Sequence, residues 1–235
     1  MELHKITSLT MQTHNTNRVN VFVDGSFRLS LGLAQVVDEG LKVGLELDEA
    51  RLMELQQKSV FGKYYQRALE YALARPHSER EVRDYLRRKT LPIAKRVRDQ
   101  NGNYKTIEKS GMDAELIQPI IEKLQKGKYL DDARFAEFWV ENRNLKKGVS
   151  ARKLRQELLK KGVANEIIEK VLAVSERTDA DEIQKIIAKK RAKYDDKKLV
   201  AHLVQRGFDY ATALRSVTDS AAPDDWSVPE TDSQN

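Results

Sequence analysis

The sequence predicts a mainly α-helical protein, built from three tandem three-helix repeats in an elongated, curved arrangement and preceded by a small N-terminal β-hairpin or sheet. Three observations predict this fold. Charged residues make up 33% of the 235 residues and aromatic residues only 7%, a composition typical of helix-rich chains. Apolar residues recur at helical spacing over most of the chain. One helical pattern occurs three times.

The repeated pattern marks one helix in each unit. A capping residue is followed at plus four and plus eight by apolar residues, and at plus twelve by Gly or Thr; the three copies begin at Ser78, Ser150 and Asp195. The spacing of four places both apolar residues on one helix face. Ser or Asp can cap the first turn, and Gly permits the left-handed turn that ends a helix. The last two caps are 45 residues apart, which predicts stacked units that share a core.

The N-terminal segment, residues 5–31, has the pattern of β-strands. Apolar residues alternate with polar ones on both sides of Asp24-Gly25, and Asp-Gly between two alternating runs is a strong hairpin signal. The stretch KITSLTMQ adds a possible third strand. A short helix over Leu33 to Glu39, stopped at Gly40, follows.

Helical patterns dominate from residue 47 onward. A first stretch runs to about Ala74, with a possible break near residues 59–62, and the Arg75-Pro76 step ends it. Residues 91–111 interrupt the pattern around Asn101-Gly102 and predict a protruding hairpin. Helices are expected over 113–126, 131–146, 150–161, 164–174, 181–194, 196–205 and 210–217. The predicted domains are an N-terminal leader (1–46), first repeat with its 91–111 insertion (47–126), second repeat (127–175), third repeat (176–218) and a disordered acidic tail (219–235).

Several classes of function are disfavoured by composition. The chain has no cysteine, which removes disulfides, thiolate metal sites and thiol catalysis. Its four histidines are scattered and no phosphate-binding loop is present. We therefore expect no catalytic residue, no metal site, no cofactor and no enzyme activity. No apolar run is long enough to span a membrane and no signal peptide is evident, so a cytoplasmic monomer is expected.

A basic helical surface is the most informative functional feature. The formal net charge is +6, but residues 219–235 contain five acidic residues and no Lys or Arg, so the rest of the chain carries +11. Arg152, Gln156 and Lys160 fall on one stripe opposite Leu154 and Leu158, where they could contact phosphates or carboxylates. A solvated helix face is the alternative. The predicted partner- or DNA-binding face comprises Arg80, Arg83, Arg87, Arg143, Lys146, Lys147, Arg152, Lys153, Arg155, Gln156, Lys160, Lys197 and Lys198.

The middle of the chain resembles a known family. The stretch KYLDDARFAEFWVENRNLKKGVSARKLRQELLKKGV is similar to the central signature of RecX, the bacterial regulator of the RecA recombinase. The matching residues are Asp132, Phe135, Ala136, Trp139, Arg143, Lys147-Gly148, Glu157-Leu158 and Lys161-Gly162. The upstream Arg75-Pro76, Ser78, Glu81 and Leu86 resemble the family's first repeat, and the N-terminal strands resemble the leader found in many members.

The resemblance implies a fold of three three-helix repeats and a protein that binds along the groove of the RecA–single-stranded DNA filament. There it would suppress ATP hydrolysis, strand exchange and co-protease activity. Two other hypotheses stay open. One is a stand-alone DNA-binding protein that uses its three-helix units in a helix-turn-helix manner, with Arg155 and Gln156 as base-reading candidates. The other is a scaffold for an acidic protein.

Overall fold

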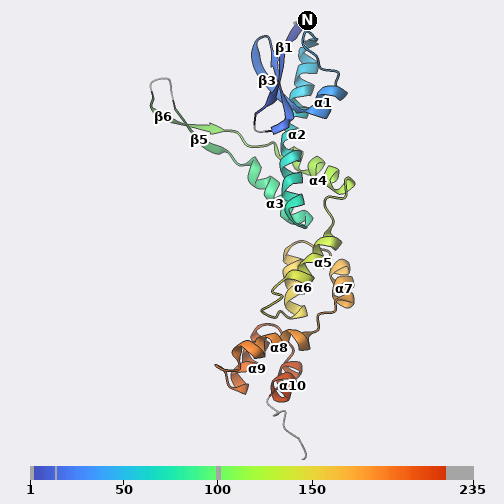
Figure 1. The fold of residues 1–235 in the computed structure, drawn as a ribbon, viewed down its shortest axis with the longest axis vertical. Coiled ribbons are helices and arrows are strands. Elements are labelled where there is room, and N and C mark those ends of the chain that lie inside the picture. Colours follow the sequence, from blue (N-terminus) through green and yellow to red (C-terminus); the bar gives the residue numbers. More distant parts are fainter. Residues whose placement is uncertain (1–2, 14, 99–101, 221–235) are drawn as a thin grey trace, which may run out of the picture. The chain divides into compact units, whose positions relative to one another are not determined.

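The computed structural model describes residues 3–13, 15–98 and 102–220 (Figure 1). Those residues include six β-strands and ten α-helices, which confirms a mainly helical protein with a small N-terminal sheet. The chain divides into two compact units, residues 1–131 and 132–235.

The N-terminal sheet has four antiparallel strands in the order β3-β2-β1-β4. They are β1 (Leu3–Gln12), β2 (Asn15–Val23), β3 (Ser26–Gly32) and β4 (Glu46–Asp48). The predicted hairpin is confirmed, because Asp24 and Gly25 form its turn with φ of 50° and 78°, as a primed two-residue turn requires. The third strand is confirmed as β1. Strand β4 was not predicted, since three residues are too few to show alternation.

Helix α1 (Leu33–Asp38) follows the sheet and ends before Gly40, whose φ of +64° is left-handed. The predicted break near residues 59–62 is wrong, because α2 (Glu49–Ala74) is continuous. Two contacts, one with β3 and one with α1, explain why a serine and a glycine occur in the middle of α2. The Ser59 hydroxyl donates to the carbonyl oxygen of Ser30 at 2.7 Å. A Cβ on Gly62 would lie 3.1 Å from Oε1 of Gln35, so glycine lets α1 approach α2.

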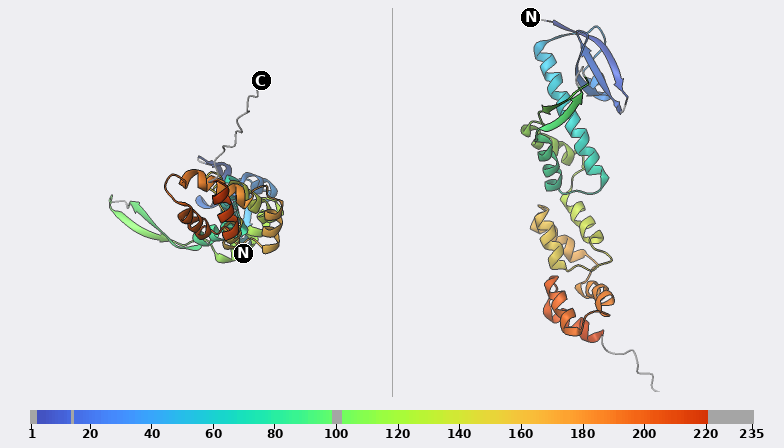
Figure 2. Two further views of the ribbon diagram at one scale, coloured as in Figure 1. Left: turned by 90° about the horizontal axis from the view of Figure 1, so that it is seen from below. Right: turned by 90° about the vertical axis from the view of Figure 1, so that its left-hand side faces the viewer.

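The first helical group consists of the second half of α2, α3 (Glu79–Thr90), the short 3₁₀ helix η1 (Ala114–Leu116) and α4 (Ile117–Lys126). The predicted stop at Arg75-Pro76 is confirmed by the extended backbone of Arg75. Between α3 and α4, strands β5 (Ile93–Arg98) and β6 (Tyr104–Lys109) pair antiparallel, which confirms the predicted hairpin. The hairpin extends away from α3 and α4 (Figures 1 and 2), and every residue of β6 is exposed.

The second unit holds two further groups of three helices. The first comprises α5 (Asp132–Asn142), α6 (Ala151–Lys160) and α7 (Asn165–Val174), and the second comprises α8 (Asp179–Lys190), α9 (Asp196–Gln205) and α10 (Tyr210–Asp219). Helix α5 ends four residues earlier than predicted. The φ of +50° at Asn144 shows why, because it is incompatible with a continuing right-handed helix.

Each helical group has a hydrophobic core of its own. The sheet with the start of α2 has its own buried cluster, and each group of three helices has another. The prediction that neighbouring units share one core is therefore wrong. A three-helix group is closed enough on its own to exclude water from side chains such as Leu86, Leu158 and Leu203, each 0% exposed. The predicted domain boundaries remain predictions, and the predicted acidic tail, apart from Asp219 and Ser220, lies outside the described residues.

The repeated capping pattern is confirmed in all three copies. The side chains of Ser78, Ser150 and Asp195 accept a hydrogen bond from the backbone N–H three residues later, at 3.2, 3.2 and 2.8 Å. Two copies end as predicted, with φ of +83° at Gly162 and +93° at Gly207. These local signals set where α3, α6 and α9 begin and where the last two stop.

Candidate partner-binding face of the helical repeats

Helix α6 presents the predicted basic stripe to solvent. Its apolar side is inside, with Leu154 and Leu158 at 2% and 0% exposure. On the opposite side, Arg152, Gln156 and Lys160 are exposed, at the i, i+4, i+8 spacing that aligns them along one face. The stripe is therefore placed as the sequence predicts.

Three cations of this helix form no ion pair with any described residue. Within the described part of the chain, Arg152, Lys153 and Lys160 have no carboxylate within ion-pair distance. The one acidic residue of α6, Glu157, does not neutralise them. Its half-buried carboxylate accepts hydrogen bonds from Arg143 at 2.7 Å and from the Trp139 indole at 3.1 Å. The solvent side of α6 therefore carries uncompensated positive charge.

Two residues of the predicted binding face, Arg143 and Arg155, form ion pairs within the protein. Arg143 forms a two-pronged pair with Glu157, at 2.7 and 3.1 Å, and packs 5.1 Å from the Trp139 ring centre. This bonding raises the pKa of Arg143. Burial acts most strongly on Glu157 and would raise its pKa, but the hydrogen bonds from Arg143 and Trp139, together with the charges of Arg143 and Lys153, hold that pKa below its ordinary value. Arg155 pairs with Glu169 at 2.6 Å. That pair disfavours base reading by Arg155 in a helix-turn-helix manner.

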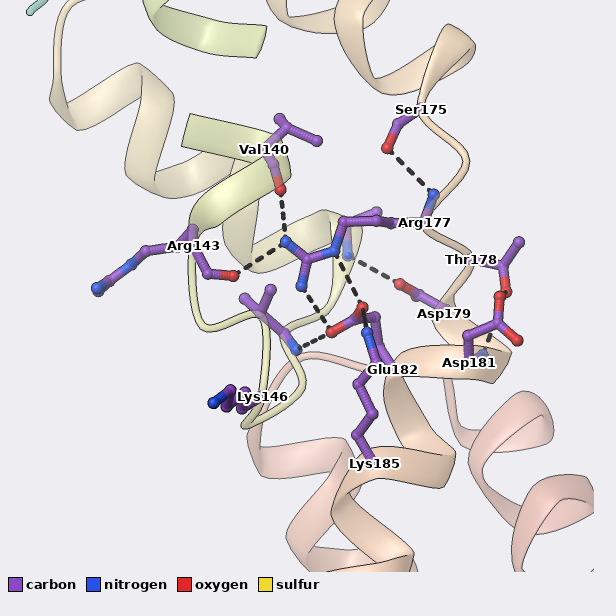
Figure 3. Close-up of polar contacts among 12 residues, drawn as sticks. Val140, Arg143, Lys146, Ser175, Arg177, Thr178, Asp179, Asp181, Glu182 and Lys185 are labelled. Atoms are coloured by element: carbon purple, nitrogen blue, oxygen red, sulfur yellow. Dashed lines mark hydrogen bonds and ion pairs between the residues drawn. The ribbon is translucent and has the colours of Figure 1, made fainter. Parts of the chain in front are cut away.

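The loop before α6 carries Lys146 and Lys147, which are both exposed. Side chains of the third repeat bind the backbone of this loop (Figure 3). The Arg177 guanidinium donates to the carbonyl oxygens of Val140 and Arg143, at 2.5 and 3.0 Å. The Lys189 ammonium contacts the carbonyl oxygen of Lys146. The carbonyls at the end of α5 thus find donors outside their own helix, as helix ends require.

Glu182 is the centre of this network. It is 1% exposed, yet its carboxylate accepts from Arg177 at 2.7 and 3.0 Å, from Lys185 at 2.6 Å and from the Val149 N–H at 2.9 Å. Burial acts to raise the pKa of Glu182, but the bonds from Arg177, Lys185 and Val149 outweigh it, and the pKa is lowered. A buried charge with this many donors is held in one geometry. The Ala151 N–H also donates to the Asp179 carboxylate at 2.8 Å. This bond and the bonds of Glu182 join the second repeat to the third.

Gly148 lets the loop approach α8. Its φ is +72°, and a Cβ there would collide with the backbone oxygen of Glu182 and lie 2.8 Å from Cγ1 of Ile186. We expect Gly148→Ala to lower the free energy of unfolding by more than about 2 kcal/mol, because left-handed strain and steric overlap add. Urea denaturation followed by circular dichroism measures this. Gly40→Ala is the control, because its φ is +64° but nothing lies within 4 Å; an equal loss in both variants would contradict the overlap.

The corresponding helices of the other repeats show partly engaged side chains. In α3, Arg83 donates to Glu79 at 2.5 Å and to Gln118 at 3.0 Å, and Arg87 lies 3.2 Å from Asp84. In α9, Lys198 lies 3.1 Å from its own capping residue, Asp195. The exposed Arg80 and Lys197 have no ion pair among the described residues.

Sequence reasoning missed Arg177 and Glu182. Arg177 lies between the predicted helices 164–174 and 181–194, and Glu182 lies at the start of the second. Their partners Val140 and Val149 are 37 and 33 residues away, too far for a local pattern to indicate. A buried Glu also has no local signature, since it occupies a position that helical periodicity would give to an apolar residue. Neither residue contacts solvent as a binding group would, and both position the loop that does.

The portion of the chain that is described contains no group of three or more His, Asp or Glu side chains arranged to hold a metal ion. None of its helices combines the length and apolarity that a membrane crossing needs.

Family models, curated relatives and solved structures that are similar to this chain all carry the description RecX. The model of the regulatory protein RecX N-terminal domain matches residues 4–48, and that of the RecX second three-helix domain matches residues 131–172. A regulatory protein RecX from Bacillus pumilus is 30% identical, with 87% of this chain and 73% of the relative covered. One from Listeria monocytogenes is 28% identical, covering 93% and 76%. A crystal structure of a regulatory protein RecX superposes with a TM-score of 0.63 at 21% identity, covering 92% of this chain and 99% of the other.

Proposed function

The chain belongs to the RecX family, and from this premise we propose that it is a non-enzymatic regulator of the RecA recombinase. It binds the RecA–single-stranded DNA filament along its groove and mostly inhibits ATP hydrolysis, strand exchange and co-protease activity. It acts as a cytoplasmic monomer without cofactor, and its three repeats with their N-terminal leader correspond to the predicted domains.

The observation that carries the proposal is the solvent side of α6. Arg152, Lys153 and Lys160 are exposed and have no internal ion pair among the described residues. Cations that are not used to stabilise the fold are available to a partner, and either DNA phosphates or carboxylates of a protein filament would pair with them. The loop with Lys146 and Lys147 adds two charges on a backbone that the Glu182 network holds in place, so little order has to be gained on binding.

The experiment is a titration of RecA ATP hydrolysis on single-stranded DNA with this protein, at about 50 and about 200 mM salt. RecA from the same organism is used. We expect inhibition below one protein molecule per RecA protomer, which indicates capping or disassembly of filaments, and weaker inhibition at the higher salt. Unchanged hydrolysis at saturating protein rejects the proposal. If DNA binding persists in that case, the protein is a stand-alone DNA-binding module.

A further inference from the structure

A second cluster of cations lies in the N-terminal unit, on residues outside the predicted binding face. It lines an open groove of about 480 Å³ formed by strands β2 and β3, the middle of α2 and the end of β6. Four basic side chains from separate parts of the chain meet there: Arg18, Lys63, Arg67 and Lys109. Arg28 adds a fifth.

These cations form no ion pair with the acidic side chains that the structure describes. Within the described residues none of them has an ion-pair partner, and Glu70 is the one acidic side chain among the residues that line the groove. The Glu70 carboxylate accepts a hydrogen bond from Gln66 at 3.2 Å. A cluster of like charges without counter-charge destabilises a fold unless a ligand supplies the opposite charge.

The like charges of the groove act on the pKa of two of its cations, Lys63 and Arg18. Burial lowers the pKa of Lys63, and the neighbouring charges of Lys109, Arg67 and Arg18 lower it further. Burial lowers the pKa of Arg18 as well, followed by the effect of Arg67. An anion bound between these side chains would reverse both effects, because it favours their charged forms.

The groove wall is rigid where the most buried cation lies. The Arg18 guanidinium donates to the carbonyl oxygen of Ser30 at 2.5 Å and to its hydroxyl at 3.0 Å. Ser30 in turn exchanges two hydrogen bonds with Ser59 on α2, at 3.2 and 2.7 Å. These bonds orient Arg18, which lines the groove.

Aromatic side chains accompany the charges. Phe27, 56% exposed, lines the groove. The ring of Tyr64 is half-buried. The Lys63 ammonium lies 5.3 Å and the Arg67 guanidinium 5.9 Å from its centre. Farther along the hairpin, Arg96 lies 4.6 Å from the ring centre of Tyr104, which is 63% exposed. Phosphate-binding cations beside exposed rings are what a single strand needs, since its backbone is charged and its unpaired bases can stack.

We propose that this groove, which we call the N-terminal groove, binds the phosphodiester backbone of single-stranded nucleic acid, and that the β5–β6 hairpin continues the same binding track. The proposal deepens the proposed function, from which it takes single-stranded DNA as the ligand. It assigns direct DNA contact to the N-terminal unit and leaves the α6 face for contacts within the filament.

The test measures binding of the full chain to a fluorescein-labelled oligothymidylate of about 15 nucleotides by anisotropy, without recombinase, at about 50 and about 200 mM salt. The variant replaces Lys63, Arg67 and Lys109 with Gln. Its control replaces three exposed lysines of the same unit, Lys42, Lys126 and Lys128, with Gln. Both remove three charges, so a change confined to the first variant reports position.

We expect the groove variant to bind about tenfold more weakly at the lower salt and to lose about 2 from the slope of log affinity against log salt, because three phosphate contacts disappear. Its thermal midpoint should not fall, because repulsion is relieved. The single change Arg67→Glu should weaken binding in the same direction and provides a second variant on an exposed position.

Three results would overturn the proposal. They are a wild-type protein that does not bind the oligonucleotide, a groove variant with the wild-type slope, and equal losses in groove and control variants. Displacement of the oligonucleotide by poly-glutamate at equal charge would show an acidic polypeptide site in its place. The assay contains no recombinase, so a failure of the ATPase titration leaves its outcome interpretable.

Discussion

Replacement of Arg152, Lys153 and Lys160 by Ala is expected to raise the concentration needed for half-inhibition of RecA ATP hydrolysis at least about tenfold, which corresponds to about 1.4 kcal/mol of binding free energy. All three side chains are exposed and free of internal ion pairs among the described residues. Their removal breaks no ion pair of the described structure and weakens a contact with phosphates or carboxylates. The inhibition curve gives the loss, and circular dichroism checks that α6 persists.

The matched control replaces Lys170, Lys193 and Arg215 by Ala. These cations belong to the same unit, are exposed and likewise have no ion pair within the described residues. The control removes the same net charge, so it should inhibit almost as well as the wild type. If both triple variants lose inhibition equally, the effect is one of net charge and the stripe is ordinary solvated surface. If neither loses it, the α6 face does not contact the filament.

Glu182→Ala is expected to be the most destabilising single change, with a loss of about 3–5 kcal/mol in the free energy of unfolding of the second unit. Removing the carboxylate leaves Arg177, 12% exposed, without its counter-charge, and leaves the Val149 N–H without an acceptor. An unpaired buried charge costs more than the lost hydrogen bonds alone. Urea denaturation measures the loss. Glu176→Ala, at an exposed position nearby, should change stability by less than about 0.5 kcal/mol.

The dependence of this stability on pH has a defined sign. The pKa of Glu182 is lower in the folded protein than its ordinary value of 4.5, because its bonds to Arg177, Lys185 and Val149 outweigh burial. The unfolded chain therefore binds the proton more readily. The contribution of Glu182 is fully present above pH 4.5 and is lost as pH falls through the folded pKa. Glu182→Gln should remove that part of the pH dependence, and an unchanged acid transition would contradict it.

The loop before α6 links the stability prediction for Glu182 to the inhibition prediction for the α6 face. The carboxylate of Glu182 and the guanidinium of Arg177 hold the backbone at Val140, Arg143 and Val149, so loss of either releases the segment with Lys146 and Lys147. We expect Glu182→Gln to weaken inhibition less than the triple change on α6, because the helix itself remains.

Much of the fold follows from local physical chemistry that a sequence displays. A Ser or Asp four residues before an apolar position satisfies free N–H groups, Asp-Gly adopts a left-handed turn, and Arg-Pro stops a helix. The capping residues of α3, α6 and α9 and the β2–β3 turn were therefore predicted to the residue. Helical spacing likewise separated the buried Leu154 and Leu158 from the exposed Arg152 and Lys160.

Tertiary structure decided which charges are available and which are used inside the protein. Arg143 and Arg152 look alike in the sequence, but the first is paired with Glu157 and the second has no such partner in the described structure. Glu182 is buried because Arg177 and Val149 reach it. The cations of the N-terminal groove come from residues 18, 63, 67 and 109, which meet only when the sheet packs on α2. Periodicity and capping act over a few residues, so the sequence by itself determined most of the helices, the β2–β3 hairpin and the exposed helix faces, whereas contacts between distant residues appear only in the folded chain.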